Sequence, residues 1–94
     1  MTTLLWSSAF TQKLKRKVRR NPELRANVEQ TLRRLAQDPF DPSLKSHKLK
    51  GELSGIWACS VKYDLRILFE FVYNDETGTK EIYLLTVGGH NEVY

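Results

Sequence analysis

Two histidines are the residues of this chain best suited to acid–base chemistry. His47 lies in a lysine-rich stretch, and His90 follows a pair of glycines, Gly88 and Gly89. An imidazole with an unperturbed pKa of about 6.5 can act as a general acid or a general base near neutral pH. Each histidine also has an ordinary explanation, His47 as a solvated strand residue and His90 as a surface residue near the end of the chain.

Charged and aromatic residues extend this candidate site. Asp64 precedes a predicted strand, where its carboxylate could take a proton or orient an imidazole, although aspartate is also common in turns. The Arg66 guanidinium could bind a phosphate through two parallel hydrogen bonds, or form an ion pair with Glu70. Tyr94 could stack on an unpaired base or donate its hydroxyl, or simply fray with the terminus. Glu52 is a further candidate for proton transfer.

Several other chemistries do not fit the sequence. The two histidines are distant from each other and Cys59 is the single cysteine, so we expect no metal site and no cofactor. The sequence has no glycine-rich phosphate-binding loop. No apolar run has the length of a membrane span, and residues 1–6 do not read as a signal peptide. The lone cysteine favours a reducing, cytoplasmic location.

The charge of the chain is divided unevenly. Residues 1–50 contain 12 Lys or Arg and 4 Asp or Glu, whereas residues 51–94 contain 3 and 7. Such asymmetry suggests a basic face that meets a polyanion, although a pair of well-solvated helices would give the same pattern.

Hydrophobic spacing predicts two helices in the first half of the chain. Apolar residues recur every fourth position from Phe10 to Val18, after N-cap candidates at Ser7 and Ser8. This helix should end near Asn21-Pro22, which also starts the second helix. The second helix has its own apolar stripe (Leu24, Val28, Leu32, Leu35) and stops at residues 38–42. Helices joined so tightly should be antiparallel neighbours.

The second half alternates with the period of strands. Leu65, Ile67 and Phe69 should face the helices, which leaves Arg66 and Glu70 on the opposite, open face. Residues 74–79 read as a hairpin loop, residues 81–87 as a strand, and the glycines at 88 and 89 as a break or bend. Trp6 and Trp57 are assigned to the core.

These elements predict a single α+β domain over residues 1–94. Two antiparallel N-terminal helices should pack on one face of an antiparallel sheet of about four strands. Residues 2–6 are short, apolar and partly β-branched, and could add an edge strand.

The ordered set of motifs resembles the RelE/ParE superfamily of type II toxins, and within it the YafQ-like ribonuclease branch. The resemblance covers nearly the whole chain. Its elements are His47 with Leu49-Lys-Gly51, Leu53-Ser-Gly-Ile-Trp57, Asp64-Leu-Arg66-Ile-Leu, and the terminal Gly-His90-x-x-x-Tyr94. The order of two helices before the strands also matches.

The resemblance implies a toxin that cleaves messenger RNA, usually in the ribosomal A site, without a metal ion. A cognate antitoxin would wrap and inhibit it. By position, the catalytic set of the branch corresponds to His47, Asp64, His90 and Tyr94. Arg66 corresponds to a phosphate-contacting arginine of many relatives, and Lys48 and Lys50 are further candidates for RNA binding.

Two positions depart from the pattern of the superfamily. Relatives often have a basic residue at the position of Ser60, and an arginine where this chain has Thr86-Val87. Two other readings stay open, and the departures bear on the second of them. One is a gyrase-directed toxin of the ParE type, which generally lacks a terminal histidine-x-x-x-aromatic ending. The other is an inactive relative that only binds its antitoxin.

Overall fold

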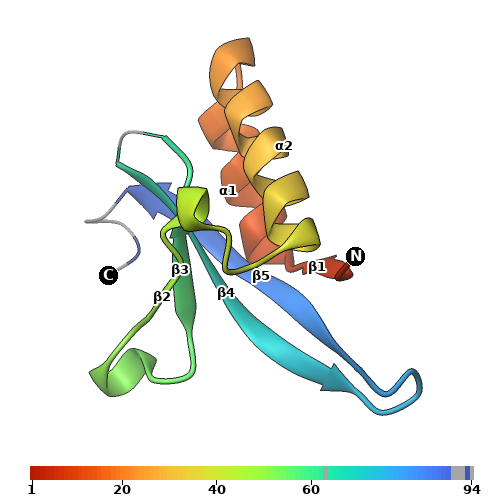
Figure 1. Ribbon diagram of the computed structural model, residues 1–94. Helices are drawn as coiled ribbons and strands as arrows, with labels where there is room; N and C mark the ends of the chain where they lie inside the picture. The colour runs from red at the N-terminus through yellow and green to blue at the C-terminus, as the bar shows by residue number, and fades with distance from the viewer. Residues whose placement is uncertain (63, 90–92, 94) are drawn as a thin grey trace.

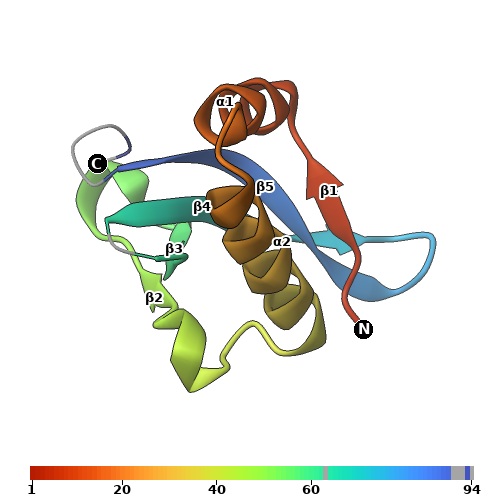
Figure 2. The same ribbon diagram turned by 90° about the horizontal axis from the view of Figure 1, so that it is seen from above.

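A computed structural model describes residues 1–62, 64–89 and 93 (Figure 1). Helices α1 and α2 lie side by side and antiparallel over one face of a sheet (Figures 1 and 2), as the sequence predicts. The elements in chain order are β1 (Leu4–Trp6), α1 (Ser8–Val18), α2 (Pro22–Gln37), the 3-10 turn η1 (Pro42–Leu44), β2 (His47–Lys48), the 3-10 turn η2 (Gly51–Leu53), β3 (Trp57–Ser60), β4 (Leu65–Asn74) and β5 (Thr79–Gly89).

The sheet has five strands in the order β1-β5-β4-β3-β2. The four strands of the second half are antiparallel to their neighbours, as expected. The N-terminal segment does form an edge strand, but β1 pairs with β5 in parallel, from Leu4 opposite Ile82 to Trp6 opposite Leu84. The sheet is therefore mixed rather than purely antiparallel, and the α+β class is confirmed.

Both helices begin at the predicted capping residues. The Ser7 hydroxyl accepts a hydrogen bond from the Phe10 amide at 3.0 Å, and the Asn21 side chain accepts one from the Leu24 amide at 3.1 Å. Helix α1 ends at Val18, slightly before the predicted Asn21-Pro22 boundary. In the described chain, no helix is long and apolar enough to cross a membrane.

The core lies between the helices and the sheet. Phe10, Val28 and Leu35 of the helices pack with Ile67 and other buried side chains of the strands. Trp57 is half-buried and packs against this cluster, in agreement with its assignment. Trp6 does not belong to the core, since its side chain is 49% exposed. It projects from the edge strand, where it contacts the Phe10 ring edge-to-face at 5.1 Å between centroids.

The end of β5 also differs from expectation. Gly88 and Gly89 do not break the strand but continue it, pairing with Arg66 and Leu65 of β4. The irregularity lies earlier, where the register shifts between Leu68 and Phe69. The two glycines pair with β4 through regular backbone hydrogen bonds. The stabilisation from this pairing outweighs the weak strand propensity of glycine.

Candidate active site

The face of β4 opposite the helices carries the central candidate residue. Leu65, Ile67 and Phe69 belong to the core cluster, so the intervening Arg66 points to the other side of the sheet. Directly paired residues of neighbouring strands share a face. Arg66 therefore lies in a row with Ser60 of β3 and Gly88 of β5.

Arg66 is partly exposed and held close to its own strand. Its Nη1 donates a long hydrogen bond to the Leu65 carbonyl at 3.5 Å. Its cross-strand neighbours are small, since Ser60 has a short side chain and Gly88 has none. A guanidinium can bind a phosphate through two parallel hydrogen bonds, and Arg66 is the arginine of this face.

Asp64 lies at the start of β4, next to the end of β5. It is exposed, and the following residue, Leu65, pairs with Gly89. The chain therefore leaves β5 beside Asp64 and Arg66, at one end of the sheet. The predicted catalytic residues His90 and Tyr94 lie outside the described residues.

His47 stands on the same side of the sheet, nearer its other edge. It pairs with Ala58, which pairs with Leu68 of β4, two residues from Arg66. Strand spacings place the Cα atoms of His47 and Arg66 roughly 12 Å apart. The imidazole is exposed, with Nδ1 3.1 Å from the Lys45 carbonyl oxygen. If Nδ1 is the donor, Nε2 is the nitrogen that can accept a proton.

The two candidate lysines occupy different surroundings. Lys48 pairs with Trp57, a residue on the helix side of the sheet, and its Nζ lies 6.0 Å from the centre of the Trp57 ring. The structure therefore directs Lys48 away from the face of Arg66. Lys50 is exposed at the start of η2, in the loop that follows β2. Glu52 lies exposed within the same turn.

The alternating pattern of β4 predicts that the face opposite the helices is exposed to solvent, but part of this face is buried. Ala58 and Leu68 are buried, with 0% and 4% of their surface exposed, although both lie on the Arg66 side. Thr86 pairs with Leu68, and its hydroxyl is buried without a hydrogen-bond partner within residues 1–62, 64–89 and 93. Thr86 is thus diagonal to Arg66 on the same face, since Arg66 pairs with Gly88.

The described part of the chain contains neither a reactive thiol nor a cluster of side chains that could bind a metal ion. Burial raises the pKa of the Cys59 thiol from its ordinary value of 9.0 to about 12, so the sulfur stays protonated. Within that part, no three His, Cys, Asp or Glu side chains are grouped to hold a metal ion.

Comparison with solved structures shows the same fold in bacterial toxins. A toxin described as YoeB/ParE from Agrobacterium tumefaciens superposes with a TM-score of 0.77 at 16% identity, over 95% of this chain and 99% of the other. YafQ from E. coli superposes with a TM-score of 0.76 at 14% sequence identity, and the match covers 100% of this chain and 99% of the other. A metal-bound toxin from Helicobacter pylori superposes with a TM-score of 0.75 at 27% sequence identity, and the match covers the whole of both chains.

Sequence comparison gives the family directly. No curated protein sequence matches the chain. The family described as "Bacterial toxin of type II toxin-antitoxin system, YafQ" matches residues 2–94. The resemblance carried by the motifs from His47 to Tyr94 is therefore confirmed at the level of the family. The chain belongs to the YafQ family of bacterial toxins of type II toxin–antitoxin systems.

Proposed function

We propose that this toxin is an endoribonuclease that cleaves messenger RNA in the ribosomal A site, in the cytoplasm, until a cognate antitoxin inhibits it. The observation that carries the proposal is the pairing of Leu65 with Gly89. It brings Asp64 and Arg66 to the end of the sheet from which the chain continues to His90. The E. coli relative YafQ was solved in complex with the antitoxin DinJ, which supports the partner.

The proposed reaction uses the RNA as its own nucleophile. The 2′-oxygen forms a bond to the adjacent phosphorus while the bond from phosphorus to the 5′-oxygen breaks. One histidine takes the proton of the 2′-hydroxyl and the other gives a proton to the leaving 5′-oxygen. The products are a 2′,3′-cyclic phosphate and a 5′-hydroxyl. Side chains supply each proton and charge, so the reaction needs no metal ion.

The other candidate residues would position and stabilise the reacting groups. Arg66 would neutralise the charge that develops on the phosphate oxygens, which is often the largest contribution to such catalysis. Asp64 would orient an imidazole, and Tyr94 would stack on a base next to the cleaved bond. Lys50, exposed in the loop after β2, would hold the RNA backbone, whereas Lys48 lies on the helix side of the sheet and has no role in this arrangement.

Mapping of RNA ends tests this proposal. Purified toxin is incubated with translating ribosomes, and with the same messenger RNA free in solution. We expect new 5′-hydroxyl ends only with ribosomes, and no cleavage where a single 2′-deoxynucleotide replaces the attacked position. Arg66→Ala should lower the cleavage rate strongly. Arg34→Ala is the matched control, because Arg34 is an exposed arginine of α2, on the other side of the sheet.

Two results would contradict ribonuclease activity. Intact messenger RNA together with inhibited supercoiling by DNA gyrase would indicate a toxin of the ParE type. Intact messenger RNA with normal gyrase activity, and retained antitoxin binding, would indicate an inactive relative. Neither result would alter the fold or the family.

A further inference from the structure

Glu70 and Arg66 point from the same face of β4, the face opposite the helices. Residues 66, 68 and 70 alternate with the core residues Ile67 and Phe69, so their side chains leave the sheet on one side. The rise of a strand places the Cα atoms of Arg66 and Glu70 roughly 13 Å apart. Within the described residues no ion pair joins the two side chains, and the Arg66 Nη1 donates to the Leu65 carbonyl.

Glu70 differs from Glu81, the other glutamate of the β4–β5 ladder, in having no partner. Both side chains are partly buried, and both lie on the Arg66 side of the sheet, since Glu81 pairs with Val72. The Glu81 carboxylate accepts a hydrogen bond from the Asn74 side chain at 2.9 Å. Glu70 makes no hydrogen bond or ion pair with the described residues. A carboxylate partly withdrawn from water without a partner costs free energy, and its oxygens stay available to a ligand.

An aromatic ring stands beside this carboxylate. Tyr83 pairs directly with Glu70 across β4 and β5, which places the two Cβ atoms roughly 5 Å apart on the same face. Tyr83 is also partly buried. A carboxylate repels the phosphates of RNA, whereas a ring next to it offers a nucleobase a surface for stacking. The pair of Glu70 and Tyr83 therefore suits a base rather than the RNA backbone.

We propose that Glu70 recognises a guanine base next to the cleaved phosphate, an inference that rests on the proposed function. An ionised carboxylate only accepts hydrogen bonds. Among the four bases, guanine alone presents two adjacent donors on its Watson–Crick edge, N1–H and N2–H, which match the two carboxylate oxygens. Adenine and cytosine have an acceptor beside their amino group, and uracil has one donor between two acceptors. With a phosphate on Arg66, the base of that nucleotide or of the next one reaches Glu70 and rests against Tyr83.

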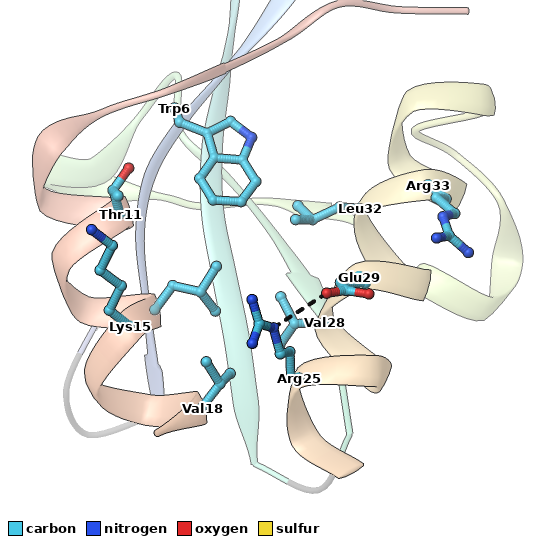
Figure 3. Close-up of a pocket in the computed structure, with 10 residues that line it drawn as sticks. Trp6, Thr11, Lys15, Val18, Arg25, Val28, Glu29, Leu32 and Arg33 are labelled. Atoms are coloured by element: carbon cyan, nitrogen blue, oxygen red, sulfur yellow. Dashed lines mark ion pairs between the residues drawn. The ribbon is translucent and has the colours of Figure 1, made fainter. Parts of the chain in front are cut away.

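RNA held on the other side of the sheet would show no such preference. A groove of about 330 Å³ lies there, between α1 and α2 (Figure 3). Val28 and Leu32 point into the gap between the helices, and Trp6 lies at one end. The exposed Lys15 and Arg33, which also line the groove, attract phosphates by charge alone. Removal of these two charges therefore separates overall attraction of RNA from recognition of a base by Glu70.

The base preference is measured both with and without cleavage. In the first assay, translating ribosomes present messenger RNAs that differ only in the base on either side of the cleaved bond, and kcat/KM is compared for the four bases. In the second assay, trinucleotides made non-cleavable by 2′-O-methyl groups, with each of the four bases at the centre, are titrated into the toxin alone and their Kd values are compared. We expect the parent to favour guanine about tenfold in both assays.

Glu70→Gln is the test variant, because the amide keeps the shape of the carboxylate but replaces one acceptor with a donor. We expect the preference to move from guanine to adenine, whose adjacent donor and acceptor match the amide. Glu81→Gln is the matched control on the same face and should keep the preference for guanine. Lys15→Gln with Arg33→Gln should weaken the binding of all four trinucleotides alike. Circular dichroism checks that each variant is folded.

The two assays distinguish failure of this inference from failure of the proposed function. A Glu70→Gln variant that cleaves with the preference of the parent would overturn the role of Glu70 and leave ribonuclease activity intact. A parent that cleaves nothing, yet binds the guanine trinucleotide selectively through Glu70, would refute the ribonuclease and support the recognition of guanine. A parent without a preference for guanine in either assay, or an equal change of preference in Glu81→Gln, would also overturn the inference.

Discussion

Arg66 lies directly opposite Gly88 in the β4–β5 ladder, so the strand position beside the guanidinium carries no side chain. On its other side the neighbour is Ser60. A bulky cross-strand partner would pack against the arginine stem and block the approach of a phosphate. Ser60 and Gly88 thus place little side-chain bulk beside the stem of Arg66.

The first prediction concerns the chemistry of Arg66. Arg66→Lys keeps the positive charge but loses the two parallel donors, so we expect kcat for ribosome-bound messenger RNA to fall roughly tenfold. Arg66→Ala should lower kcat about a hundredfold or more, because a charge-stabilising donor is removed. Quench-flow measurement of cleavage separates kcat from KM. Equal rates for the lysine and arginine forms would argue against bidentate phosphate binding.

The second prediction concerns Ser7, which joins α1 to the sheet. Its hydroxyl accepts a hydrogen bond from the Phe10 amide and donates one to the Leu85 carbonyl, both at 3.0 Å. Ser7→Ala should lower the free energy of unfolding in urea by about 1–2 kcal/mol. Ser8→Ala is the control, since Ser8 is exposed within the helix. Equal stability of the two variants would refute the capping role.

The third prediction concerns the buried hydroxyl of Thr86. It makes no hydrogen bond within the described residues, so Thr86→Val should raise the free energy of unfolding by about 1 kcal/mol. Thr31→Val is the comparison, because the buried Thr31 hydroxyl donates to the Asn27 carbonyl at 2.8 Å. Thermal unfolding should rank the Thr86 variant above the parent and the Thr31 variant at or below it. A drop in stability for Thr86→Val would mean that its hydroxyl is satisfied.

The fourth prediction concerns Cys59. Burial raises its thiol pKa from 9.0 to about 12, so a thiol reagent should label the native protein far more slowly than the protein in denaturant. Between pH 9 and 12 the unfolded thiol loses its proton while the folded thiol keeps it. The folded state therefore binds more protons in this window, and its stability falls as pH rises. Native labelling as fast as denatured labelling would disprove the burial.

The sequence by itself determined the helices and the direction of the main strands. Ser7 and Asn21 carry polar side chains that cap a helix locally, and the alternation along β4 separates Arg66 from Leu65 and Ile67 without any long-range information. The ordered motifs around Asp64 and His47 were also enough to indicate the toxin family.

Only the tertiary structure decided the arrangement at the edges of the sheet. Trp6 looks like a core residue, yet β1 pairs in parallel with β5 and leaves its indole half-exposed at the end of the groove. Lys48 is adjacent to His47 in sequence, but pairing with Trp57 directs it to the opposite face. Gly88 and Gly89 extend β5 because β4 supplies their partners. Local patterns describe a residue and its chain neighbours, whereas strand pairing and the gap between two helices depend on segments far apart in the sequence.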